Sequence, residues 1–218
     1  MTGLSKLDAA PDAGLDVQQE NSAQPDNLGQ VLIPLARDVI ARALGRPGVA
    51  GEEHLPCLHE DAATFVTLTQ NLQLRGCIGS LQAHRPLLQD LKANAYAAAF
   101  RDPRFSPLLA HELDETEVEV SLLSAMQPLQ FHDEQHACSQ LRAGLDGVTL
   151  EFGSYRSTFL PQVWAQLPEV DDFMARLKQK AGLPANFWHE ELRLYLYTVQ
   201  KFRESDAAPS IDARKVKA

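Results

Sequence analysis

The residues best suited to chemistry lie in the segment "LRGCIGS", residues 74–80. Arg75 and Cys77 are two residues apart, and residues two apart on a β-strand point to the same face. An unperturbed thiol has a pKa near 8.5 and is only about 3% thiolate at pH 7, but a nearby cation favours the charged form. Cys77 could therefore be a nucleophile or a substrate-contacting thiol activated by Arg75. The alternative is a structural cysteine, because cysteine is often buried.

Two glycines flank this cysteine, Gly76 and Gly79. Glycine weakens a strand, so its presence indicates that a backbone or a ligand approaches closely. The same G-x-x-G spacing occurs in a nucleic-acid clamp loop, but that loop joins helices and this segment alternates like a strand. The motif therefore indicates a strand that leaves room for close approach, rather than a nucleic-acid clamp.

Three polar residues elsewhere are further candidates for the cleft. In "STFLPQVW", residues 157–164, Thr158 and Gln162 can hydrogen-bond a ligand, while Trp164 is better explained as a core aromatic. In "EVEVSLL", residues 117–123, Glu119 alternates with apolar residues and would face Arg75 if the two strands shared a sheet. We expect Thr158, Gln162 and Glu119 to contribute to one site.

Histidine and cysteine groups give no clear metal signal. His132 and His136 are four apart and could bind one metal from a helix, but the glutamate between them is not where the H-E-x-x-H motif requires it. A second group combines ligand-type side chains in a loop without implied geometry: His54, Cys57, His59 and Asp61. We predict no metal site and no cofactor.

Composition and charge restrict the partners. The chain has 218 residues and a formal charge of −9, and residues 28–202 alone carry 15 basic and 21 acidic side chains. This acidity disfavours binding to nucleic acid. No secretory signal and no run of membrane-spanning length is present, so we expect a cytoplasmic protein with no membrane partner. Three widely spaced cysteines argue against a disulfide framework.

Hydrophobic periodicity predicts the elements that position these residues. Helical spacing covers residues 28–44, 86–100, 134–143 and 171–182, and period-two alternation covers two strands within 63–80, then 117–123, 148–153, 155–160 and 192–202. Alternation in the second strand would turn Leu72, Leu74 and Ile78 towards an apolar layer. Mixed helices and hairpin-length connections predict an α+β fold with an antiparallel sheet flanked by helices. Residues 1–27 and 203–218 are polar and are predicted to be disordered tails.

Several blocks in order resemble the AMMECR domain family, whose bacterial and archaeal members are called AmmeMemoRadiSam system protein A. The blocks are "LRGCIGSL", "FRDPRFSPL", "EVEVSLL", "GLDGVTLEFG", "STFLPQVWAQLP" and "FMARLKQKAGLP", spread over residues 28–202. The resemblance implies one AMMECR domain of two lobes, a larger and a smaller one, with a cleft lined by the "LRGCIG" residues.

The same resemblance implies partners but no particular reaction. The family name records an association with a Memo-like protein, similar to non-haem iron dioxygenases, and with a radical S-adenosylmethionine (radical SAM) protein. Two functions remain open. The first is an accessory component that binds a small molecule or a partner in the cleft. The second is an enzyme that uses Cys77 beside Arg75.

Overall fold

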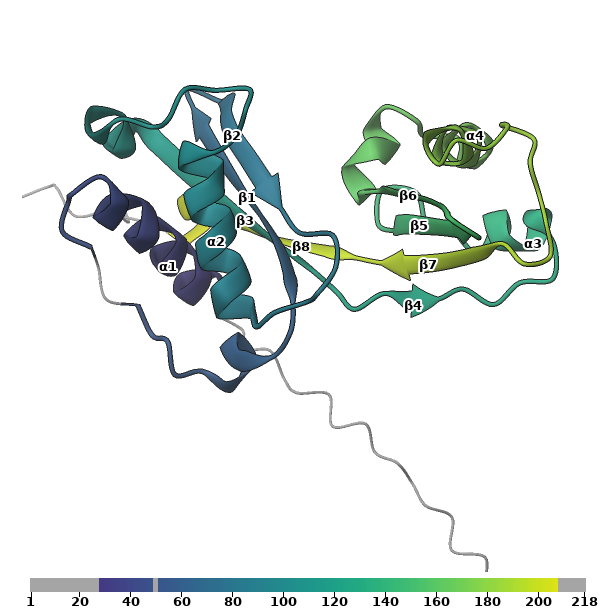
Figure 1. The fold of residues 1–218 in the computed structure, drawn as a ribbon, viewed down its shortest axis with the longest axis horizontal. Coiled ribbons are helices and arrows are strands. Elements are labelled where there is room, and N and C mark those ends of the chain that lie inside the picture. Colours follow the sequence, from purple (N-terminus) through teal and green to yellow (C-terminus); the bar gives the residue numbers. More distant parts are fainter. Residues whose placement is uncertain (1–27, 49–50, 208–218) are drawn as a thin grey trace, which may run out of the picture.

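The computed structural model describes residues 28–48 and 51–207. Within them, helices and antiparallel strands form two lobes that lie side by side (Figure 1). The predicted α+β fold with antiparallel pairing is confirmed. The predicted tail at residues 1–27 and most of the second tail, residues 208–218, lie outside the described residues.

The first lobe is a four-stranded sheet covered on one face by two helices (Figure 1). Its strand order is β2-β1-β3-β8, with β1 Ala63–Gln70, β2 Gln73–Gly79, β3 Thr116–Leu123 and β8 Val199–Arg203. The helices are α1 Leu28–Ala43 and α2 Leu87–Phe100, and short 3-10 helices span Pro56–His59 and Ala110–Glu115. Alternate side chains of β1 and β3 pack under the helices as one core, including Val66, Leu68, Val118 and Val120. The residues between them face the other way.

The second lobe is another four-stranded sheet, of order β4-β7-β5-β6. It contains β4 Gln127–Pro128, β5 Gly147–Phe152, β6 Tyr155–Phe159 and β7 Arg193–Tyr197, with α3 Glu134–Ser139, α4 Val170–Lys180 and a 3-10 helix, η3, at Pro161–Ala165. In its core the rings of Trp164 and Phe173 stack with centroids 3.7 Å apart. The Trp164 indole N–H donates to the Asp146 carbonyl oxygen at 2.7 Å, which fixes the ring.

The prediction of one strand over residues 192–202 is wrong, because this segment forms two strands in two different sheets. Thr198 separates β7 from β8. Its amide donates to the Ser124 hydroxyl, and its carbonyl accepts from the Ser124 amide, each at 2.9 Å. Ser124 itself follows β3, so two extended segments cross between the lobes next to each other (Figure 1). Alternation continues through such a crossing and therefore does not reveal it.

The ordered chain also extends past the predicted boundary at residue 202. Arg203 ends β8, and α5 spans Glu204–Ala207. The Glu204 carboxylate accepts hydrogen bonds from Arg37 Nη1 at 3.0 Å and from the Val118 amide at 3.2 Å. Residues 203–207 therefore belong to the first lobe rather than to a tail.

Candidate ligand-binding cavity

The face of the first sheet opposite its helices carries two rows of side chains in register. In the first row, Thr67 on β1 pairs with Cys77 on β2 and with Glu119 on β3, and Glu119 pairs with Arg203 on β8. The next row runs through Gly79, Phe65, Ser121 and Lys201 on the same four strands. Because directly paired residues point to the same side of a sheet, both rows face the second lobe.

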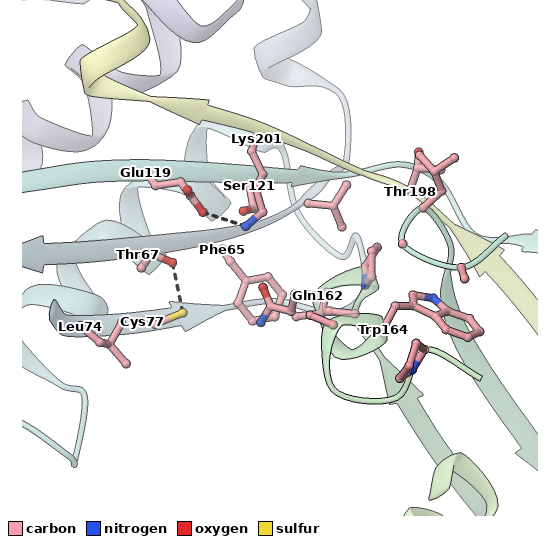
Figure 2. A pocket seen from close by; sticks show the side chains of 18 of the residues that line it. Phe65, Thr67, Leu74, Cys77, Glu119, Ser121, Gln162, Trp164, Thr198 and Lys201 are labelled. Carbon is pink, nitrogen blue, oxygen red and sulfur yellow. Dashed lines mark hydrogen bonds and ion pairs between the residues drawn. The ribbon is translucent and has the colours of Figure 1, made fainter. Parts of the chain in front are cut away.

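A cavity of about 890 Å³ lies between this face and the second lobe. Figure 2 shows side chains from both lobes around it, with Cys77 and Glu119 at one end and Trp164 at the other. The lining residues from the first lobe include Phe65, Thr67, Leu74, Cys77, Arg104, Glu119, Ser121 and Lys201; those from the second include Ala143, Leu145, Leu160, Gln162 and Trp164. From the "LRGCIG" segment, Leu74 and Cys77 line this cavity.

Cys77 is held through both its backbone and its sulfur. The Thr67 hydroxyl donates a hydrogen bond to Cys77 Sγ at 3.3 Å. The Cys77 amide donates to Asp102 Oδ2 at 2.9 Å, and its carbonyl accepts from Arg104 Nη2 at 3.1 Å. Arg104 in turn donates to Asp102, which holds the pKa of that carboxyl far below its usual range. The Asp102–Arg104 pair thus hydrogen-bonds the edge of β2 as a neighbouring strand would.

Arg75 does not line the cavity, so the prediction that it shares a face with Cys77 is wrong. In the ladder, Leu68 pairs with Gly76 but Thr69 pairs with Leu74, which leaves Arg75 as the extra residue of a β-bulge. The bulge reverses the alternation. Leu74 therefore joins Cys77 at the cavity, and the prediction that Leu74 faces the apolar layer is also wrong. Leu72, likewise expected there, is 95% exposed in the turn.

The Arg75 guanidinium instead holds the 3-10 helix at Ala110–Glu115. Its Nε donates to Glu112 Oε1 at 3.0 Å, and its Nη1 donates to the Ser106 carbonyl at 2.9 Å. The hydrogen bond from Arg75 is the main reason that the pKa of Glu112 is lowered to about 2. Arg75 is therefore a structural cation in this arrangement.

Glu119 lines the cavity, but its counter-charges are Lys201 and Arg203 rather than Arg75. It accepts from Arg203 Nε at 2.8 Å and lies 3.2 Å from Lys201 Nζ. Burial alone would raise the pKa of Glu119, yet these two cations lower it on balance. The sheet therefore presents an ionised carboxylate shared by two basic side chains.

A different close contact explains each of the two motif glycines. A Cβ on Gly76 would collide with the carbonyl oxygen of Ala98, so Gly76 lets α2 pack directly on β2. A Cβ on Gly79 would collide with the ring of Phe65, which lies over Gly79 and lines the cavity. Neither glycine is among the described residues that line the cavity.

Of the two candidates in "STFLPQVW", only Gln162 reaches the cavity. Thr158 hydrogen-bonds Thr149 Oγ1 and the Tyr197 hydroxyl, each at 3.0 Å. It borders a separate pocket of about 330 Å³ together with Arg156 and Lys180. Trp164 is a core residue, as predicted, but one side of its ring also lines the cavity.

Sequence reasoning did not identify several polar residues of the cavity wall, among them Thr67, Arg104, Ser121 and Lys201. Thr67 and Ser121 occupy the polar face of strands that were predicted, so alternation could have found them. Arg104 lies in "FRDPRFSPL", a block of the family resemblance for which we predicted no site residue. Lys201 could not be recognised as a residue of the cavity wall from a single predicted strand over residues 192–202, because only the second half of that segment joins the first sheet.

The described residues contain no group of three or more His, Cys, Asp or Glu side chains placed to hold a metal ion. The rings of His132 and His136 stack with centroids 4.2 Å apart, and His132 Nε2 lies 3.5 Å from Asp133. Among the same residues, no helix combines the length and the apolar character needed to cross a bilayer.

Comparisons with known proteins agree with this two-lobed fold. Residues 33–202 match the sequence model of the AMMECR1 family. Protein MJ0810 of Methanocaldococcus jannaschii is 32% identical over 192 residues, which cover 86% of this chain and 96% of that protein. A protein of Methanothermobacter thermautotrophicus is 36% identical over 81% of this chain and 94% of its own length. The crystal structure of the uncharacterised protein PH0010 from Pyrococcus horikoshii superposes with a TM-score of 0.67 at 32% identity, covering 81% of this chain and 91% of that one. The chain therefore belongs to the AMMECR1 family.

Proposed function

We propose that this protein is an accessory component that binds a small molecule in the cavity between its lobes. The observation that carries the proposal is the cavity itself, about 890 Å³ in volume and lined by both lobes. Pockets for small molecules typically occupy about 300–1,000 Å³ and often lie where two structural units meet. The volume and the position are therefore those of a ligand site.

The lining supports the same proposal. Most of it is apolar, with Phe65, Leu160 and Trp164 among its walls. Polar groups are few and converge on the space: within residues 28–48 and 51–207, no protein group hydrogen-bonds the Ser121 hydroxyl or the Gln162 amide. Both groups are therefore free to hydrogen-bond a molecule bound in the cavity.

The second candidate is an enzyme that uses Cys77 as a nucleophile or substrate-contacting thiol. It is favoured by the Thr67 hydroxyl, which donates to Sγ at 3.3 Å inside the cavity. Arg104, rather than Arg75, would be the cation beside the thiol. No histidine is among the described residues of the cavity wall, so an imidazole base of the usual kind is not supplied there. Ligand binding is therefore the better supported function.

We also propose the partners that the family resemblance implies, a Memo-like protein and a radical SAM protein. The test is direct association of the purified proteins, measured by size-exclusion chromatography with light scattering. A complex containing this chain would support the proposal. Three separate peaks at micromolar concentrations, in the presence and absence of bound ligand, would contradict it.

Ligand binding is tested by ligand-observed NMR with a fragment library of acids, amides and amines. Ala143 lines the cavity and is exposed, so Ala143→Trp should fill it without breaking a side-chain hydrogen bond. Ala93→Trp places the same ring on the exposed side of α2 and is the matched control. We expect binders whose signal is lost in Ala143→Trp and kept in Ala93→Trp. A library with no such binders would contradict the proposed function.

A further inference from the structure

The geometry points to a molecule with one carboxylate and an apolar body as the ligand of the cavity, an inference that rests on the proposed function. The carboxylate would bind between Ser121 and Lys201. The apolar body would extend towards Trp164. The inference comes from the distribution of charge and of unpaired polar groups over the cavity wall.

The subsite for the acid is formed by two residues that pair across neighbouring strands. Ser121 on β3 lies opposite Lys201 on β8, and both line the cavity (Figure 2). The Ser121 side chain belongs to a residue only 8% exposed, and no group within the described chain hydrogen-bonds its hydroxyl. A hydroxyl that faces the cavity and has no partner in the described chain is free to donate a hydrogen bond to an acceptor on a ligand there.

The charges favour an anion over a cation. Lys201 lies 3.2 Å from Glu119, but the same carboxylate already accepts from Arg203 at 2.8 Å. The Glu119 carboxylate is therefore shared by two cations, of which Arg203 also interacts with Asp206 and Glu117. An anion next to Lys201 would be attracted by its ammonium group, whereas an ammonium group on the ligand would add a third cation around Glu119.

A single carboxylate fits better than a phosphate group. Arg104, the other cation of the wall, is engaged by Asp102 through a hydrogen bond of 2.6 Å and by the Cys77 carbonyl. Phosphate sites commonly combine several arginine, lysine or helix-terminus donors. Here one ammonium group and one hydroxyl remain, which matches the two oxygens of one carboxylate.

The opposite end of the cavity is suited to an aromatic or aliphatic body. Trp164 lies at this end, and its ring is immobilised by its stacking on Phe173 and by its bond to the Asp146 carbonyl. Leu145 and Leu160 add apolar surface to the cavity wall. Figure 2 shows Gln162 between this end and Phe65. Its amide can both donate to and accept from a polar group in the middle of the ligand.

Three probes with one indole body test the inference: indole-3-propionic acid, indole-3-propanamide and tryptamine. Their dissociation constants are measured by titration calorimetry with the wild type and with Ala143→Trp. We expect the acid to bind at least about tenfold more tightly than the amide, because a charged hydrogen bond is lost in the amide. Tryptamine should bind most weakly, and Ala143→Trp should abolish binding of the acid.

Two variants locate the acid within the cavity. Lys201→Met should weaken binding of indole-3-propionic acid about tenfold or more, and Ser121→Ala about threefold to tenfold, while affinity for the amide changes little after Lys201→Met. Lys92→Met is the control, since Lys92 pairs with Glu53 away from the cavity. It should leave every dissociation constant unchanged.

The possible failures separate the two proposals. Amide or amine binding as tight as that of the acid, with sensitivity to Ala143→Trp, overturns the carboxylate inference and retains a ligand-binding cavity. Equal binding of the acid by wild type and Lys201→Met also overturns it. If no probe binds the wild type, the carboxylate inference is overturned, and the fragment library decides the proposed function independently.

Discussion

Arg75 and Cys77 are two residues apart on β2, yet only Cys77 borders the cavity, while Arg75 donates to Glu112 at 3.0 Å. The bulge at Arg75 separates the two functions of the motif. The arginine fastens the 3-10 helix at Ala110–Glu115 to the sheet. The cysteine lines the cavity, whose wall also carries the cations Arg104 and Lys201.

Replacing Arg75 should therefore lower the stability of the fold and leave the reactivity of the Cys77 thiol unchanged. Arg75→Met removes an ion pair whose two side chains are 14% and 20% exposed, together with bonds to backbone carbonyls. We expect a loss of about 1–3 kcal/mol in the free energy of unfolding, measured in urea. The alkylation rate of Cys77 should stay within twofold of the wild type. Arg176→Met, on the exposed side of α4, is the control, and a large change in Cys77 reactivity in Arg75→Met would contradict this role.

The Arg75–Glu112 pair should also make stability fall in acid. The pKa of Glu112 is about 2 in the folded protein, compared with about 4.3 in an unfolded chain. Its contribution is therefore complete above about pH 4.3 and is lost as the pH falls towards 2, and it is on the order of 1–3 kcal/mol. Urea unfolding at several pH values should show that the free energy of unfolding falls less steeply in acid for Glu112→Gln than for the wild type. Parallel pH profiles for the two proteins would refute the assignment.

The bond from Thr67 to Cys77 should increase the reactivity of the thiol. Thr67→Val keeps the shape of the side chain but removes the donor to Sγ, so iodoacetamide should alkylate Cys77 several-fold more slowly at pH 8. Thr69→Val is the matched control on the same strand. Cys138 is an internal comparison that should react slowly, because burial raises the pKa of its thiol. A Cys77 that reacts only after denaturation would instead be structural.

The two motif glycines should respond differently to a methyl group. Gly76→Ala pushes against the backbone of α2 at Ala98, which cannot move alone, and should lower the free energy of unfolding by about 1–3 kcal/mol or more. Gly79→Ala pushes against the Thr64 carbonyl oxygen and against the Phe65 ring, so it should lower stability as well and, in addition, displace the cavity wall and weaken ligand binding. Thermal unfolding and ligand titration of both variants distinguish these effects. Equal binding by Gly79→Ala and the wild type would argue against Phe65 as part of the site.

The sequence was sufficient to predict the helices and most strands because apolar spacing is a local property. The period-two spacing of Val66 and Leu68 along β1 agrees with their place in the core. It failed at Arg75 because a bulge adds one residue without a distinctive residue type, and at Thr198 because a crossing between sheets leaves the alternation intact. The cavity depends on contacts between distant segments, such as Ser121 with Lys201, which follow only from the register.

The central claim is that the cavity between the lobes is a ligand site, and wild-type crystals soaked with the fragment library test it most directly. We predict electron density for bound fragments between Cys77 and Trp164, with acids ordered at Ser121 and Lys201. Fragments found only on other surfaces, with the cavity occupied by water in every soaked crystal, would contradict the claim.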